Sequence, residues 1–273
     1  MKVLGTRILV LIAFALLVPS GRAQVSVVGE LTRESRGKPG ETLKGVVLLQ
    51  NSSDKPASVK IYQTDYLCYA DGRNLYGDPG TIARSNAKWV TVSPNRLTIP
   101  PKQTGTANYT VQLPPDSALK GTYWSMVMVE PVGEGNVEFT PEKLAKNELV
   151  KFGIRTVMRY GLQIVVDIGN TGTRQLKFLD RKLISQGGKR YLQLDIENTG
   201  ERWLKPTVWA ELFNSEGASA GRFDGGQIRV FPGCSIRQRV DLTPVPKGKY
   251  KTMVIFDNGD ESVFGAQYDL LME

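Results

Sequence analysis

The chain has 273 residues, of which 41% are hydrophobic and 23% charged, with a net charge of +8 and no histidine. The lack of histidine removes the commonest general base and metal ligand at neutral pH, and two cysteines cannot build a zinc site. There is no dinucleotide or phosphate-loop fingerprint and no basic run interleaved with aromatics. We therefore predict no enzymatic activity, no cofactor and no nucleic-acid partner.

The first 23 residues have the layout of a secretory signal peptide. Lys2 and Arg7 precede an apolar stretch at residues 8–18, and Ala23 ends a small-residue cleavage motif. The apolar stretch is too short to cross a bilayer, which needs about 20 residues. We predict an exported protein, located in the periplasm or at the cell surface, without a transmembrane anchor.

Short stretches of alternating apolar and polar residues follow, separated by Gly, Pro, Asn and Asp, which is typical of β-sandwiches. The two halves share three features in the same order: an asparagine turn after a strand (Asn51, Asn198), an apolar stretch ending at proline (Pro100, Pro232), and a Gly-x-Tyr-x-x-Met-Val segment (121–127, 248–254). This order indicates an internal duplication. The first copy carries about 20 extra residues, which we place within residues 72–89.

Residues 150–168 carry apolar side chains at nearly every even position. At about 3.3 Å per residue, one strand of this length would span roughly 60 Å, about three times the usual strand. We predict that the run is the last strand of the first domain, bends at Gly161 and continues as an early strand of the second. A single very long edge hairpin is the alternative. The predicted fold is all-β, with two tandem immunoglobulin-like β-sandwiches at residues 24–168 and 169–273.

This arrangement resembles the PapD-like periplasmic pilus chaperones, in which two immunoglobulin-like domains are set in an L. The stretch "WVTVSPNRLTIPPKQTGTANYTV" (89–111) resembles the family's strand, proline turn and long strand. The segment "GTYWSMVMVEP" (121–131) resembles its penultimate first-domain strand, and "IRTVMR" (154–159) resembles its last one. The resemblance covers most of the chain beyond residue 23.

The resemblance implies a protein client, a β-rich pilus or envelope subunit that lacks one strand. Chaperones of this family insert their last first-domain strand into the open groove of the subunit, and two basic residues hold its C-terminal carboxylate. Carried over to this sequence, Arg33 and Arg155 are the carboxylate anchors. The edge strand that contacts the client contributes Val150, Phe152, Ile154 and Met158.

Two charged residues favour a second interpretation. Lys146 and Glu148 occupy alternate positions just before Val150, where large hydrophobic side chains are expected for insertion into an apolar groove. The alternative function is a structural or adhesive envelope protein, in which the tandem domains belong to a stable surface complex.

The only cysteines are Cys68 and Cys234. An oxidising compartment permits a disulfide, but the two residues fall in different predicted domains, whereas a bridge across an immunoglobulin-like sandwich joins residues of one domain. The sequence favours two free thiols and leaves an interdomain bridge open.

Overall fold

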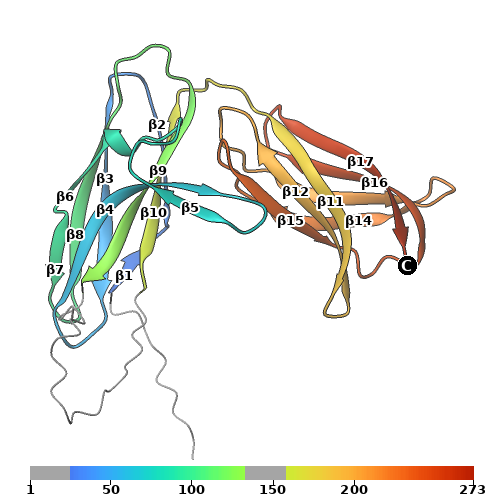
Figure 1. Ribbon diagram of the computed structural model, residues 1–273, viewed down its shortest axis with the longest axis horizontal. Coiled ribbons are helices and arrows are strands. Elements are labelled where there is room, and N and C mark those ends of the chain that lie inside the picture. The colour runs from blue at the N-terminus through green and yellow to red at the C-terminus, as the bar shows by residue number, and fades with distance from the viewer. Residues whose placement is uncertain (1–24, 133–157) are drawn as a thin grey trace, which may run out of the picture.

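The computed structural model describes residues 25–132 and 158–273, and these form an all-β protein of two sandwiches set at an angle to each other (Figure 1). In the first sandwich, one sheet has the order β1–β3–β8–β6 (Val25–Val28, Thr42–Asn51, Thr104–Gln112, Val90–Ser93). The facing sheet has the order β2–β10–β9–β4–β5 (Thr32–Gly37, Tyr160–Ile168, Gly121–Val132, Ala57–Cys68, Asn74–Gly77). Strand β7 (Arg96–Ile99) also pairs with β4, and a single 3₁₀ turn, η1, spans Ala87–Trp89.

The second sandwich pairs a three-stranded sheet with a four-stranded one. The first has the order β11–β12–β15 (Leu176–Gln186, Lys189–Asn198, Ser235–Asp241). The second has the order β14–β13–β16–β17 (Ser219–Gln227, Thr207–Phe213, Gly248–Asp257, Val263–Met272). The predicted fold class, two tandem immunoglobulin-like sandwiches, is confirmed.

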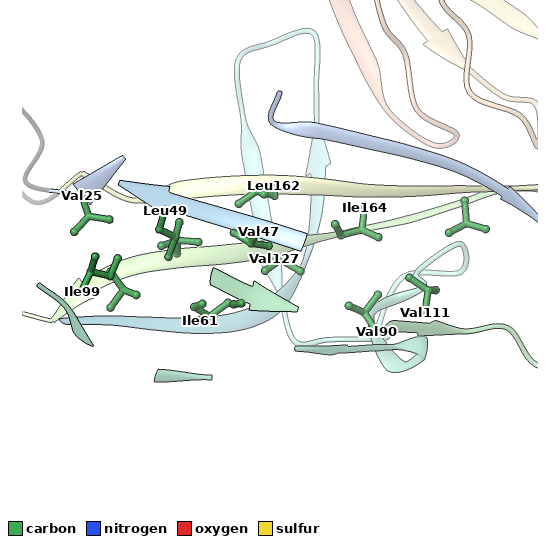
Figure 2. Close-up of a cluster of buried hydrophobic side chains, with 14 of the residues drawn as sticks. Val25, Val47, Leu49, Ile61, Val90, Ile99, Val111, Val127, Leu162 and Ile164 are labelled. Carbon is green, nitrogen blue, oxygen red and sulfur yellow. The ribbon is translucent and has the colours of Figure 1, made fainter. Parts of the chain in front are cut away.

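Each sandwich has its own apolar core, built from the inward-facing residues of alternating strands. Figure 2 shows the first core, where Val47, Ile61, Val127 and Leu162 from four strands meet between the sheets. The second core is centred on Leu194, Ala210 and Phe256 and the side chains around them. Burial of alternate residues explains why the strand pattern was readable in the sequence.

The internal duplication is visible in two asparagines that occupy equivalent turns. The side-chain amide of Asn51 donates to the carbonyl four residues on (2.8 Å) and to that of Ile99 (3.0 Å). The amide of Asn198 donates to the carbonyl four residues on (2.7 Å) and to that of Val230 (2.9 Å). Both asparagines are fully buried. Each therefore ties the end of a strand to the proline-containing segment that the sequence comparison had paired with it.

The Gly-x-Tyr-x-x-Met-Val segments are also equivalent in the structure. Gly121 and Gly248 begin β9 and β16, each of which lies between two partner strands, and Val127 and Val254 point into the two cores. The extra residues of the first copy, 72–89, form β5, the loop after it and η1. The β4–β5 hairpin extends as an arm toward the second sandwich (Figure 1).

One prediction about the long alternating run is wrong. Residues 160–168 form the single strand β10, which stays in the first sandwich and pairs with β9 along its whole length. Gly161 does not mark a bend: it faces Met128 across the ladder, and a Cβ at this position would clash with Cε of Met126. The small residue makes room for a methionine, and residues 169–175 make the connection to β11 instead.

Candidate functional site

A stack of aromatic side chains joins the two sandwiches. The ring of Trp124, on β9, lies 4.1 Å from that of Phe231 in the second sandwich, with 17° between the planes. Phe231 in turn stacks on Trp203, with centroids 5.2 Å apart. Trp124 is fully buried and Val165 of β10 is 1% exposed in the same cluster. Because this apolar cluster spans the boundary, the angle between the domains is held by packing.

Arg202 adds a buried polar contact beside the aromatic stack. Its guanidinium is paired with the Asp167 carboxylate at 3.0 Å, and the exposed fractions of the two side chains are 6% and 15%. It also donates to the carbonyl oxygens of Gly169 (3.4 Å) and Thr171 (3.2 Å) in the connecting segment. One side chain therefore holds both the end of β10 and the chain that leaves it.

Glu201, the neighbour of Arg202, binds two cations of the first sandwich. Its carboxylate lies 3.0 Å from Nζ of Lys120 and 3.2 Å from the guanidinium of Arg84. The hydrogen bond from Lys120 and a backbone bond from Thr173 lower the pKa of Glu201 below its usual value. Its backbone oxygen also accepts the amide of Thr122 at 2.8 Å. The turn after β12 is thus fixed to the start of β9.

The loop between β5 and η1 is organised by Asp65, which is 1% exposed. Its carboxylate accepts the backbone amides of Thr81 (2.6 Å) and Ile82 (3.0 Å) and the hydroxyl of Ser85. Burial acts to raise the pKa of Asp65, but the hydrogen bonds outweigh it and the net pKa is lowered.

A lowered folded-state pKa means that ionised Asp65 stabilises the fold above its unfolded pKa of about 3.9, and that this stability is lost as the pH falls through the folded pKa. We expect Asp65→Asn to lower the free energy of unfolding at pH 7 by about 1–3 kcal/mol. The difference from wild type should shrink below about pH 4. Urea unfolding at pH 7 and pH 3 measures both values. The exposed Asp54→Asn is the control, and an equal loss at both pH values would contradict this role for the carboxylate.

The N-terminal chain changes sheets, so β2 pairs with only part of β10. Strand β1 pairs with β3 in one sheet, whereas β2 pairs in parallel with β10 in the other, beginning at Thr32 opposite Gln163. The amide of Gln163 donates to the carbonyl of Leu31 at 2.7 Å. Within the residues the structure describes, Tyr160–Leu162 have a strand partner only on the β9 side. Backbone alternation directs the N–H and C=O of Gly161 toward this open edge.

Arg33 lies beside this open edge. It faces Ile164 across the parallel ladder, so its side chain points toward the space between the sheets. Its Nη2 donates to the carbonyl of Val28 at 3.3 Å, and its buried Nε has no hydrogen-bond partner among the described residues. Burial raises the pKa of the Tyr109 hydroxyl, and the charge of Arg33 opposes that rise. Arg33 is thus a cation with hydrogen-bonding capacity to spare.

The residues on either side of Arg33 face the second sandwich. The carboxylate of Glu34 pairs with Nζ of Lys205 at 2.9 Å, and the hydroxyl of Thr32 accepts from Arg229 at 3.2 Å. Strand β2 therefore braces the domain junction with one face and carries Arg33 on the other.

Of the other predicted site residues, only Met158 falls within the described part of the chain. It precedes β10 by two positions and is 49% exposed. The remaining four lie outside the described residues: Val150, Phe152, Ile154 and Arg155.

Sequence reasoning missed a polar cluster at the start of β10. The Tyr62 hydroxyl donates to the Glu130 carboxylate at 2.9 Å, and the same carboxylate lies 3.8 Å from the guanidinium of Arg159. Burial, followed by the hydrogen bond to Glu130, raises the pKa of Tyr62. The sequence does contain a signal for this cluster. Arg159 stands at an odd position of the run, which places its side chain on the opposite face of the strand from the apolar even-numbered residues. The cluster gives the outer face of the sheet a polar rim next to the open edge.

Neither a metal site nor a membrane-spanning helix is found in residues 25–132 and 158–273. No three His, Cys, Asp or Glu side chains of these ranges gather in a metal-binding arrangement. No helix in these ranges is long and apolar enough to cross a bilayer.

Comparison with solved structures shows which known fold this chain shares. No protein-family model and no curated protein sequence matches the chain. Among solved structures, a chain from a chaperone–tip adhesin complex of CFA/I fimbriae biogenesis is similar, with a TM-score of 0.50 and 12% identity over 92% of this chain and 100% of that one. The chain therefore has the fold of a PapD-like fimbrial chaperone, as the sequence resemblance indicated.

Two further solved structures show weaker similarity. The class 5 fimbriae chaperone CfaA has a TM-score of 0.47 and 13% identity, covering 90% of this chain and 99% of its own. A chain of the CsuC–CsuE chaperone–tip adhesion subunit complex from Acinetobacter baumannii has a TM-score of 0.43 and 11% identity, covering 90% and 98%.

Proposed function

We propose that this protein is a non-catalytic chaperone or assembly factor of the periplasm or cell surface, exported by removal of residues 1–23. It binds a β-rich envelope or pilus subunit by strand addition along the chain segment that ends in β10. The observation that carries this proposal is the edge at Tyr160–Leu162, which no strand of residues 25–132 or 158–273 covers, in a fold shared with fimbrial chaperones. The two proposed domains are residues 24–168 and 169–273.

Strand addition uses two kinds of contact. Backbone N–H and C=O groups on the open edge supply affinity, and alternate side chains supply specificity. In the sequence, the proposed client-binding residues share the even positions of the core-facing residues of β10: Val150, Phe152, Ile154 and Met158. Each such side chain buried in a client would contribute about 1.5–3 kcal/mol, so several are needed to outweigh the cost of ordering the strand.

The proposed anchors for the client's C-terminal carboxylate are Arg33 and Arg155. An arginine can hold a carboxylate with two parallel charge-assisted hydrogen bonds. For Arg33, the support is its position beside the open edge and its Nε, which has no hydrogen-bond partner in the part of the chain that the structure describes. For Arg155, the support is its place in the "IRTVMR" segment.

We expect Arg155→Ala to weaken client binding by at least about 30-fold, because loss of one partner from a desolvated charge pair costs about 2–5 kcal/mol. The test co-expresses the protein with an incomplete β-sandwich subunit and measures the affinity of the purified complex. Arg96→Ala removes an exposed arginine from β7 of the same domain and is the matched control. Unchanged affinity of Arg155→Ala would reject the anchor, and unchanged affinity of Phe152→Asp would reject strand addition.

A second candidate is a structural or adhesive envelope protein built into a stable surface complex. The charged Lys146 and Glu148 favour it, because charges oppose insertion into an apolar groove. Fractionation separates the two candidates: a structural component is recovered in stoichiometric amount with the assembled surface complex, whereas a chaperone is absent from it.

A further inference from the structure

The two cysteines meet across the domain junction. Cys68 is the last residue of β4, at the tip of the arm next to the turn into β5, and Cys234 immediately precedes β15 in the second sandwich. The backbone nitrogen of Cys68 lies 3.4 Å from Sγ of Cys234, although 166 positions separate them. Cys234 belongs to the buried cluster that contains Trp124 and Phe231, and the partly buried Cys68 packs against it.

The distances suit a covalent bond. A backbone N–Cα bond measures about 1.46 Å, so Cα of Cys68 lies within about 4.9 Å of Sγ of Cys234. In a disulfide the two Cα atoms lie about 4.4–6.8 Å apart, and a Cα of one cysteine this close to the sulfur of the other is compatible with that range. The backbone amide of Cys68 already donates to Sγ of Cys234, so rotation of the Cys68 side chain brings its sulfur atom toward that of Cys234.

Both backbones are held in place by other contacts. The amide of Cys234 donates to the carbonyl of Phe231 (3.0 Å), and its carbonyl accepts the amide of Asn198 (3.0 Å). On the arm, the amide of Ala70 donates to the hydroxyl of Ser235 at 3.0 Å. The folded chain therefore keeps the two thiols together, which raises the effective concentration of one thiol for the other.

We propose that Cys68 and Cys234 form an interdomain disulfide that locks the arm of the first domain to the second domain. The oxidant is a disulfide, either a low-molecular-weight one or that of a thiol oxidase. The Cys68 thiolate attacks one sulfur of the oxidant and releases the other as a thiol. The Cys234 thiol then loses its proton to solvent and displaces the second thiol, so the protein loses two hydrogens and the oxidant gains them.

The environments of the two residues fit this order of events. The hydrogen bond from the Cys234 thiol lowers the pKa of Cys68 even though burial opposes it, whereas this hydrogen bond and burial raise the pKa of Cys234. Cys68 is also partly exposed and Cys234 is buried. The thiol that ionises more easily is thus the one that an oxidant can reach.

To test this, the reduced, purified protein is treated with oxidised glutathione, and the remaining thiols are alkylated under denaturing conditions. The mass of the product is then measured by mass spectrometry. We expect both thiols to disappear with a loss of about 2 Da. Trypsin should then yield residues 61–73 linked to residues 230–237. Cys68→Ser and Cys234→Ala should each retain a single thiol or carry one glutathione. Two surviving thiols, separate glutathione adducts on wild type, or a disulfide-linked dimer would overturn the proposal.

Stabilisation of the domain junction by the disulfide can be measured without any client protein, from the melting temperature. We expect the oxidised protein to melt roughly 5–15 °C above the reduced protein, because the bond closes a long loop of chain. The two single variants should show no dependence on reductant. Equal melting temperatures of the oxidised and reduced wild type would overturn the claim that the bond stabilises the junction.

Discussion

Trp124→Ala is expected to lower the free energy of unfolding by about 3–5 kcal/mol, the range for removing a large buried aromatic side chain. Trp124 is fully buried, stacks on Phe231 at 4.1 Å and meets the edge of Tyr66 at 5.9 Å. The substitution creates a cavity at the domain junction, so we also expect the two domains to move more freely relative to each other. Urea unfolding followed by circular dichroism measures the first effect, and the radius of gyration from small-angle scattering measures the second.

The matched control is Trp209→Ala, which removes a partly exposed tryptophan from β13 of the second sandwich. Trp124→Phe is the second variant, because it keeps an aromatic ring against Phe231 and should recover more than half of the lost stability. The role of the stack would be contradicted if Trp124→Ala and Trp209→Ala had the same stability and the same radius of gyration.

The fold was predictable because its signals are local. Alternation of apolar residues identified the strands, and the turns at Asn51 and Asn198 identified the repeated unit. Gly121 and Gly248 marked the two equivalent strands β9 and β16. Each of these features depends on the burial or hydrogen bonding of a few neighbouring residues, so the sequence carries it directly.

The course of β10 was less predictable. Its even positions are buried in the first core, but Val165 is also buried, because the second sandwich covers the outer face of the sheet there. Such two-sided burial has no signature in a simple alternating pattern. The sequence pattern predicts a bend at Gly161, whereas this glycine makes room for Met126; a bend and a close contact favour the same residue type.

The candidate site was partly predictable. Resemblance to a known family suggested Arg33, but its position beside an edge that no described strand covers follows only from the sheet change between β1 and β2. The contact between Cys68 and Cys234 was also hidden. The sequence assigned them correctly to different sandwiches, yet only the angle between the sandwiches brings them together.

Arg202→Ala is expected to cost about 3–5 kcal/mol of stability, comparable to the loss of Trp124, because removing one partner of a buried ion pair leaves the other charge uncompensated. Here the partner left behind is Asp167, whose side chain is 15% exposed. The carbonyl oxygens of Gly169 and Thr171 also lose a donor. Urea unfolding at pH 7 measures the loss, and Arg202→Ala combined with Asp167→Asn should recover part of it by removing the orphaned charge.

Arg237→Ala is the control, because the ion pair of Arg237 has better hydrogen-bond geometry than that of Arg202 but is more exposed to solvent. Arg237 holds Asp195 through two hydrogen bonds of 2.7 Å, yet its side chain is 37% exposed. Its loss should cost less than about 1 kcal/mol, since water replaces the pair at an exposed site. If Arg202→Ala were no more destabilising than Arg237→Ala, the junction would depend on its aromatic stack alone. A larger cost for Arg202→Ala would mean that the chain leaving β10 is fixed by charge as well as by packing, which keeps the open edge of that strand in a constant place relative to the second domain.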